Sequence, residues 1–208
     1  MAEWLDIRDG GRLLYDAGFC PPAEADALFA WLRSEIPWRQ ETVHGNPLPR
    51  LNAWFADDGL RYSYSGLSHL GTGWLPELAE IKRAVEVASA AVFNSLLLNL
   101  YRHGHDSIGF HTDAEPELGE NPVVATVSFG SERDFVLRHR KTRETRTYRV
   151  GHGNLLVMAG TSQHHWLHAI PKTDEVVGER ISLTFRRIRP AATDQQAERD
   201  AAAGPPRP

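Results

Sequence analysis

Cysteine is almost missing from this 208-residue chain, which contains only Cys20. A single thiol excludes an internal disulfide and any zinc site built from several cysteines. Such cysteine usage is typical of a reducing compartment, so we expect the cytoplasm. Long hydrophobic runs are missing too, because no apolar stretch approaches the roughly 18 residues of a membrane helix. Residues 1–11 are polar and charged, unlike a secretory signal, and we expect no membrane partner.

An excess of positive charge is also lacking. The chain has 23 lysines and arginines against 27 acidic residues, for a net charge of -4. A mildly acidic protein has no general electrostatic attraction to nucleic acid. Residues 133–149 are a local exception, with seven basic and two acidic side chains. This run is either a solvated hairpin or a phosphate contact, for which Arg138 and Arg140 are candidates.

Two stretches have the apolar spacing of one helix face. The first follows Pro21 and Pro22, which suit a first helical turn, and stops at Pro37. The second covers about residues 75–89. The two apolar faces consist of Ala25, Leu28, Trp31 and Leu32 in the first stretch and Leu78, Ile81, Val85 and Ala88 in the second.

From residue 93 onward the chain consists of short apolar runs, many separated by Gly, Asn, Asp or Pro, which is typical of a sandwich or barrel. The runs cover residues 93–101, 123–129, 134–138, 146–150, 154–158, 164–168 and 181–188. We therefore predict an α+β, mainly β fold: a jelly roll over 93–188 with two N-terminal supporting helices. One domain would cover 1–189, and the Ala-, Pro- and charge-rich residues 190–208 are predicted to be a disordered tail.

A His-x-Asp pair, His111 and Asp113, lies near the end of one predicted strand. Side chains alternate along a strand, so both should project from one side. A second imidazole would complete the two-histidine, one-carboxylate set of non-haem Fe(II) oxygenases. His164 and His168 share a face of the predicted strand at 164–168, and alternation does not choose between them. A zinc hydrolase could use the same ligand types.

Two arginines favour iron over that zinc hydrolase. Arg180 and Arg186 share the polar face of an alternating strand. That face could simply meet water, but inside a barrel two buried guanidinium groups would need an anion. Guanidinium grips a carboxylate bidentately, so a dicarboxylate such as 2-oxoglutarate would fit. Asn99 and Tyr101 could add neutral hydrogen bonds to the same ligand.

Taken together, these motifs resemble the AlkB-type 2-oxoglutarate- and Fe(II)-dependent dioxygenases, in the branch of nucleic-acid demethylases. The similarity covers about residues 37–188. It is carried by N-L-Y at 99–101, H-T-D-A-E at 111–115, S-F-G-S-E-R-D-F at 128–135, W-L-H at 166–168 and R-I-S-L-T-F-R at 180–186, with P-R at 49–50 and D-G-L-R-Y-S-Y-S-G at 58–66 upstream.

The resemblance implies a double-stranded β-helix and a set of site residues. The implied Fe(II) ligands are His111, Asp113 and His168, which would form the catalytic centre. The implied 2-oxoglutarate pocket consists of Arg180, which would pair with the distal carboxylate, and of Asn99, Tyr101, Thr184 and Arg186. The implied substrate contacts, several of them in a nucleotide-recognition segment at about 38–66, are Arg50 beside the nucleotide backbone, Tyr64 stacked on the base, and Tyr62 and Glu115 at the base edge.

The implied activity is oxidative removal of a methyl group from a base nitrogen, as in 1-methyladenine or 3-methylcytosine, with consumption of O2 and 2-oxoglutarate. Duplex-acting relatives carry a bulky apolar wedge where this chain has Val43-His44-Gly45-Asn46. We therefore expect a preference for single-stranded DNA or RNA. We also expect a monomer. Ala114, where close relatives have a second acid, keeps open the alternative of hydroxylating or demethylating a protein side chain or small metabolite. A non-catalytic binding module is a third hypothesis.

Overall fold

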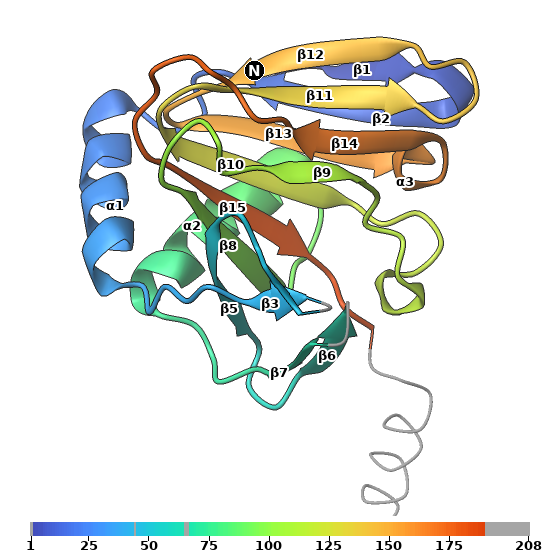
Figure 1. Cartoon of the computed structure of the whole chain (residues 1–208). Coiled ribbons are helices and arrows are strands. Elements are labelled where there is room, and N and C mark those ends of the chain that lie inside the picture. The colour runs from blue at the N-terminus through green and yellow to red at the C-terminus, as the bar shows by residue number, and fades with distance from the viewer. Residues whose placement is uncertain (1, 44, 65–66, 190–208) are drawn as a thin grey trace, which may run out of the picture.

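Figure 1 shows the protein as a computed structural model that describes residues 2–43, 45–64 and 67–189, with only the backbone of residues 63, 64, 67 and 68. His44 of the expected wedge segment and the tail expected at 190–208 lie outside these ranges. Within them, no helix combines the length and apolar character that crossing a membrane requires.

Two antiparallel sheets form the body of the molecule (Figure 1). The larger one has the strand order β1 (Trp4–Ile7), β2 (Gly11–Asp16), β13 (Asn154–Gly160), β10 (Val124–Gly130), β15 (Arg180–Arg186), β8 (Ser95–Tyr101) and β5 (Leu51–Ala56). The smaller one has the order β12 (Thr145–Val150), β11 (Arg133–His139), β14 (Trp166–Ile170) and β9 (Ile108–His111). Two-stranded ribbons are formed by β3 (Thr42–Val43) with β4 (Asn46–Pro47) and by β6 (Arg61–Tyr64) with β7 (Leu67–Leu70).

Both long helices pack on the larger sheet. Helix α1 (Pro22–Glu35) has proline in its first turn, and α2 (Pro76–Ser89) ends where Ala90 adopts a left-handed backbone conformation with φ 52°. Leu32 and Val85, one from each helix, belong to a core cluster that includes Leu98 of β8 and Leu183 of β15. Burial of such apolar faces contributes most of the stability of helices in proteins. The predicted mainly β fold with two supporting helices is confirmed.

A second core cluster fills the space between the sheets. It joins Tyr101, Phe135, Leu137, Met158 and Trp166, which come from β8 and β13 of the larger sheet and from β11 and β14 of the smaller one. The inward faces of the two sheets therefore make a sandwich, and the polar site described below interrupts this apolar layer.

The two edges of the larger sheet come from the first 56 residues, and one expected strand begins later than predicted. The polar N-terminal residues form the hairpin β1–β2, and β2 pairs with β13 at one side of the larger sheet. Residues 51–56, which lie in the expected nucleotide-recognition segment, form β5, which pairs with β8 in the same sheet. The strand expected over 164–168 begins only at Trp166, because Ser162–His165 form the short helix α3. The remaining short helical turns are η1 (Arg8–Gly10) and η2 (Pro116–Leu118).

Candidate active site

A β-bulge in β9 directs His111 inward. Ile108 pairs with Ile170 and His111 with His168, so three steps on β9 match two on β14. Strict alternation would place Ile108 and His111 on opposite faces, but the bulge absorbs the extra residue and both line one cavity. Phe110, within the bulge, is 37% exposed.

The hydrogen bond of His111 determines which of its nitrogens can bind a metal. His111 Nδ1 lies 2.8 Å from the carbonyl oxygen of Gly109. A carbonyl can only accept, so Nδ1 carries the proton of the neutral ring and Nε2 keeps its lone pair. The backbone of the bulge thus prepares His111 to bind a cation through Nε2.

His168 lies directly across from His111 on β14. Their ring centroids are 4.1 Å apart, and the ring of Phe135 stacks on His168 at 5.5 Å with an interplanar angle of 12°. Burial, reinforced by the charge of His111, lowers the pKa of His168 to about 3. The imidazole is therefore neutral at physiological pH, as a metal ligand must be.

Asp113 follows the end of β9 and does not share the strand of His111, contrary to the alternation argument. Its position is fixed from two sides. The amide nitrogen of Asp113 donates to Gln163 Oε1 at 2.9 Å, and Arg186 Nη2 donates to Asp113 Oδ1 at 2.8 Å. Burial by itself would raise the pKa of Asp113, but the charges of Arg186, His168 and His111 lower it to about 2. The group is a carboxylate at any physiological pH.

These three side chains fit a divalent cation. One nitrogen or oxygen atom from each lies within 4.8 Å of the others. Asp113 Oδ2 is buried, makes no hydrogen bond with the described residues, and lies 3.6 Å from His168 Nε2. Two imidazoles and a carboxylate that leave other coordination positions open match a non-haem iron site.

Arg180 provides an anion site next to this cluster. It is 1% exposed, and its Nη2 donates to Ser128 Oγ at 2.8 Å. Its Nε and Nη1 are buried and make no hydrogen bond with the described residues. Burial lowers the pKa of Arg180, and the interaction with Tyr101 offsets this effect only in part. A carboxylate would satisfy both nitrogen atoms and the charge.

The residues expected to bind 2-oxoglutarate line one cavity together with His111 and His168. Its remaining polar walls come from neighbouring strands of the larger sheet, since Arg180 pairs with Tyr101 and Ser182 with Asn99. The polar lining consists of Asn99, Tyr101, Thr126, Arg180, Ser182, Thr184 and Arg186. The alternating pattern of β15 thus faces a cavity rather than water.

Arg50 is buried behind the wall of the cavity. It is 8% exposed, and its guanidinium donates to Asn99 Oδ1 at 2.8 Å and to the carbonyl of Ser107 at 3.2 Å. Because Asn99 lines the cavity, Arg50 supports its wall from behind. The contact of Arg50 with a nucleotide backbone stays a prediction.

The other expected base contacts lie partly within the described structure. Tyr62 is 5% exposed, and burial raises the pKa of its phenol. Glu115 is half-buried, and its pKa is raised chiefly by burial and further by the charge of Asp113. Both groups are thus close enough to the centre to be influenced by Asp113. The side chain of Tyr64 lies outside the described residues.

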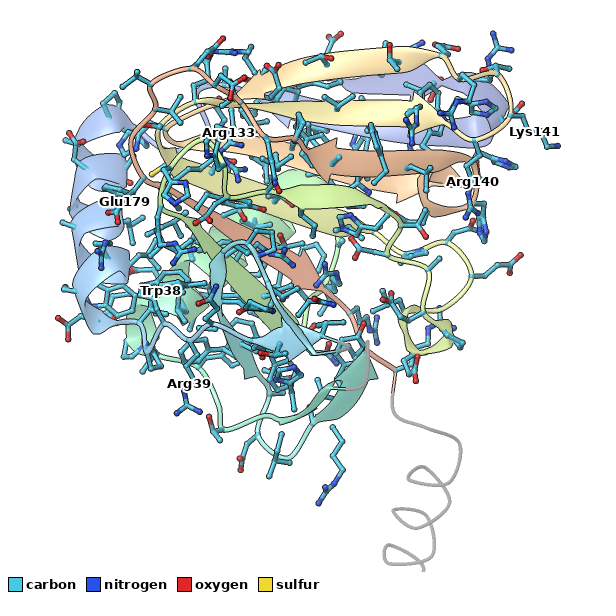
Figure 2. The ribbon with its side chains drawn as sticks, in the orientation of Figure 1. Trp38, Arg39, Arg133, Arg140, Lys141 and Glu179 are labelled. Carbon is cyan, nitrogen blue, oxygen red and sulfur yellow. The ribbon has the colours of Figure 1, made fainter. Side chains whose placement is uncertain are left out.

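The basic run at 133–149 divides into paired and unpaired parts. Arg149 makes ion pairs with Glu132 at 2.9 Å and Asp134 at 3.2 Å, and Arg133 is buried. Arg138 lies with its guanidinium carbon 3.6 Å from the ring centroid of Phe110, and Arg140 is exposed. Figure 2 shows Arg140 and Lys141 at the far end of the β11–β12 hairpin from Arg133.

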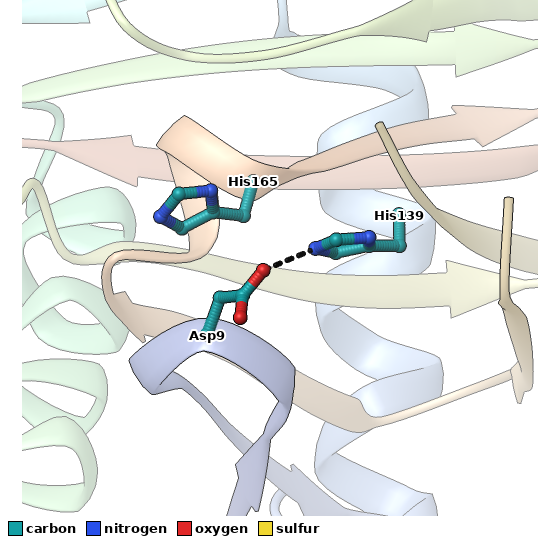
Figure 3. Close-up of side chains that lie close together, drawn as sticks. All are labelled: Asp9, His139 and His165. Carbon is teal, nitrogen blue, oxygen red and sulfur yellow. Dashed lines mark hydrogen bonds and ion pairs between the residues drawn. The ribbon is translucent and has the colours of Figure 1, made fainter. Parts of the chain in front are cut away.

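A second His-Asp-His group, Asp9, His139 and His165, also brings its ligand atoms within 4.8 Å (Figure 3). Hydrogen bonding distinguishes it from the first. The amide of Thr142 donates to His139 Nδ1 at 3.1 Å, so the proton of the neutral ring is on Nε2, which donates to Asp9 Oδ2 at 2.9 Å. His139 therefore presents a proton where a metal ligand needs a lone pair. The hydrogen bond between Asp9 and His139 joins the N-terminal turn η1 to the β11–β12 hairpin, and we call this group the latch.

Several supporting residues escape sequence reasoning. Gln163 holds the Asp113 backbone and Phe135 stacks on His168, and neither has a spacing relation to its partner. Ser128 could have been found, because it lies on the same alternating face of β10 as Thr126. His164, the alternative to His168, bonds through Nε2 to the carbonyl of Glu120 instead.

Several proteins of known name are similar to this chain in sequence. The chain is 37% identical over 183 residues to bovine "DNA oxidative demethylase ALKBH2", covering 81% of this chain and 66% of that protein. It is 38% identical to bovine "Alpha-ketoglutarate-dependent dioxygenase alkB homolog 3" (86% and 67% covered) and 37% identical to mouse ALKBH2 (90% and 85%). The chain thus spans about two thirds of the two bovine relatives.

Solved structures show the same fold. The structure of OsALKBH1 superposes with a TM-score of 0.62 at 15% identity, covering 89% of this chain and all of that one. An oxidoreductase of the 2OG-Fe(II) oxygenase family from Burkholderia pseudomallei gives a TM-score of 0.57 at 17% identity, with 86% and 85% covered. The sequence profile of the 2OG-Fe(II) oxygenase superfamily matches residues 12–186, a span that contains both the histidine–aspartate centre and the buried arginines. With AlkB-type relatives above 30% identity on the same span, this chain belongs to the 2OG-Fe(II) oxygenase superfamily.

Proposed function

We propose that this protein is an Fe(II)- and 2-oxoglutarate-dependent dioxygenase that removes alkyl groups from bases in nucleic acid. The observation that carries the proposal is the juxtaposition, in one cavity, of a cation site and an anion site. His111 and His168 line the cavity beside Asp113, and Arg180 lines it with two guanidinium nitrogens that make no hydrogen bond to any described residue. The relatives named for demethylation of DNA support the choice of substrate class.

The residues divide the work between two ligands. His111, Asp113 and His168 would hold Fe(II), and Arg180 would hold the distal carboxylate of 2-oxoglutarate with help from Tyr101 and Asn99. Bound iron supplies activation of O2, coupled to oxidation of 2-oxoglutarate to succinate and CO2. The methyl group gains one oxygen atom, and the resulting hemiaminal releases formaldehyde and the unmodified base.

Arg186 links the two parts of the centre. It lines the cavity and also donates to Asp113 Oδ1, which fixes the carboxylate in one orientation. Tyr62 and Glu115 lie close to this ion pair and are our candidates for contacting the target base. A half-buried carboxylate can accept a hydrogen bond from an exocyclic amino group of a base.

We further propose that a monomer acts preferentially on single strands. The base must leave the stack to enter the cavity, and that costs least in unpaired nucleic acid. On the outer face of the smaller sheet, Arg138 stacks over the exposed ring of Phe110, and Arg140 lies nearby on the hairpin. Stacked aromatic and guanidinium groups suit unpaired bases and phosphates.

The test is a panel of oligonucleotides that carry 1-methyladenine or 3-methylcytosine as single-stranded DNA, duplex DNA and RNA. Formaldehyde release and mass spectrometry of the product are measured with Fe(II), 2-oxoglutarate and O2 present, and Asp113→Asn is the inactive control. We expect demethylation, fastest on single strands. Turnover of 2-oxoglutarate with no change in any oligonucleotide would reject the nucleic-acid substrate and favour a protein or metabolite substrate.

The contribution of the basic hairpin is tested separately. Arg138→Gln with Arg140→Gln should raise KM for the oligonucleotide and reduce the dependence of binding on salt by roughly one unit of slope per lost phosphate contact. Arg149→Gln, on the same hairpin but paired with Glu132 and Asp134, is the matched control and should change neither quantity.

A further inference from the structure

Arg133 is a buried arginine that binds only backbone. It begins β11, is 3% exposed, and donates from Nη1 to the carbonyl of His103 at 3.3 Å. Its Nη2 donates to the carbonyls of Gly104 at 3.1 Å, Asp106 at 3.0 Å and Pro171 at 2.6 Å. Among the described residues, no carboxylate lies within salt-bridge distance of Arg133, and its hydrogen bonds all go to peptide carbonyls.

These four carbonyls come from two separate segments. Residues 103–106 form the turn that follows β8, and Pro171 follows the end of β14. One guanidinium therefore fastens the larger sheet to the smaller one directly behind Tyr101, the last residue of β8. Tyr101 is 2% exposed and lines the proposed 2-oxoglutarate cavity.

The ring of Tyr101 lies close to two cations. The guanidinium carbon of Arg180 is 5.1 Å from the ring centroid, and that of Arg133 is 5.9 Å from it. Two buried positive charges close to one ring disfavour one another, since the charge of Arg133 lowers the pKa of Arg180, and a tyrosine ring compensates them only in part. A carboxylate bound to Arg180 would offset both charges.

We propose that Arg133 is a positioning residue of the 2-oxoglutarate pocket: it fixes Tyr101 and adds a second buried positive charge behind the carboxylate-binding Arg180. The proposal rests on 2-oxoglutarate being the co-substrate of this chain. It also replaces the sequence-based expectation for Arg133, since the basic run at 133–149 had suggested a contact with phosphates. Figure 2 shows Arg133 at the start of β11, far from the hairpin end that carries Arg140 and Lys141.

Two substitutions separate charge from hydrogen bonding. Arg133→Gln removes the charge and most of the donors, whereas Arg133→Lys keeps the charge but cannot reach four carbonyls with a planar fork. Binding of 2-oxoglutarate is measured without turnover, as the rise in melting temperature that added 2-oxoglutarate produces in metal-free and in Mn²⁺-loaded protein. KM values for 2-oxoglutarate and for a methylated oligonucleotide are measured in parallel.

We expect Arg133→Gln to weaken 2-oxoglutarate binding about tenfold or more and Arg133→Lys to recover part of that loss. The oligonucleotide KM and its salt dependence should not change, and Arg149→Gln should behave as wild type. If both Arg133 variants lower the melting temperature but bind 2-oxoglutarate like wild type, Arg133 is purely structural and the proposal fails. A raised KM for the oligonucleotide would indicate that Arg133 contacts phosphates, and this result would also overturn the proposal.

The two proposals fail in different ways. If the wild-type protein binds 2-oxoglutarate but demethylates no oligonucleotide, the nucleic-acid substrate is rejected and the proposed role of Arg133 stands. If Arg133→Gln does not fold, Arg133→Lys alone decides, because a weakened 2-oxoglutarate response with an unchanged oligonucleotide KM supports the proposal and an unchanged response rejects it.

Discussion

Arg186 donates a hydrogen bond to Asp113 over 2.8 Å, although the two residues lie 73 positions apart in the chain. This bond uses Asp113 Oδ1 and leaves Oδ2 directed toward His168 Nε2, 3.6 Å away. Partners that orient a ligating carboxylate usually matter nearly as much as the ligand itself. The metal centre therefore depends on Arg186, a residue of β15.

Arg186→Gln should weaken metal binding about tenfold to a hundredfold, because Asp113 loses both its orientation and the charge that keeps it ionised. Anaerobic titration with Fe(II), or titration with Mn²⁺ in air, measures the affinity. The neighbouring Arg187 is exposed, so Arg187→Gln is the matched control and should bind metal like wild type. Equal affinities for all three proteins would contradict an orienting role for Arg186.

Metal stoichiometry distinguishes the two His-Asp-His groups. The hydrogen-bond pattern predicts one bound ion per chain, since Nε2 of His139 carries a proton and that of His111 does not. Asp113→Asn should abolish binding, and Asp9→Asn should leave it intact because an amide oxygen can still accept the bond from His139. Two ions per wild-type chain, with one lost in Asp9→Asn, would show that the latch is a second metal site.

Arg180 should control affinity for 2-oxoglutarate without affecting the metal. Arg180→Lys retains the charge but loses the fork, so KM for 2-oxoglutarate should rise about tenfold. Arg180→Gln removes the charge as well and should cost about 2–5 kcal/mol of binding free energy, the usual loss for a buried charged pair. Steady-state kinetics and direct 2-oxoglutarate binding measure both effects, and an unchanged KM in Arg180→Gln would show that the carboxylate binds elsewhere.

Asp106 gives the fold a pH-dependent contribution. It is 2% exposed and accepts from the amide, Nε and Nη2 of Arg102 at 2.7–2.9 Å. Burial would raise the pKa of Asp106, but these hydrogen bonds outweigh it and lower the pKa. The stabilisation is thus fully present above the unfolded pKa of about 3.9 and is lost as the pH falls through the lower folded value.

Asp106→Asn should therefore lower the free energy of unfolding by about 2 kcal/mol at pH 7, with a smaller difference from wild type near pH 3. Urea denaturation at both pH values measures this. Asp174→Asn is a suitable control, because its carboxylate is fully exposed. Its one ion pair joins Asp174 Oδ1 to Nε2 of the exposed His105 over 3.4 Å in the described structure. A difference that stays constant between pH 7 and pH 3 would mean that the ionised carboxylate of Asp106 is not what stabilises the fold.

The parts of this protein that were predictable are those in which one element carries its own pattern. The strand from Arg180 to Arg186 alternates polar and apolar residues over its whole length, and it faces a cavity on one side and the core on the other. The two helices begin at prolines and bury the apolar faces read from their spacing. In each case the local sequence and the tertiary environment agree.

What was not predictable depends on contacts between distant segments. The strands of the hairpin β1–β2 are short and partly solvated, so its pairing with β13 leaves little periodic signal. In the sequence, Arg133 and Arg50 look like surface charges. Only the fold shows that Arg133 donates hydrogen bonds to backbone carbonyls and that Arg50 donates one to Asn99. Asp113 lies beyond the strand end, and its orientation comes from Gln163 and Arg186, which no spacing rule connects to it.

The N-terminal hairpin has a consequence for protein production. Strand β2 occupies the side of β13 that would otherwise present unpaired peptide groups, and the latch of Asp9 with His139 keeps the hairpin in place. A chain shortened to begin at residue 17 would keep every cavity residue yet expose β13 as an open template for another molecule. Such a truncated protein would self-associate through strand addition, and its loss of solubility could be mistaken for a loss of catalytic competence.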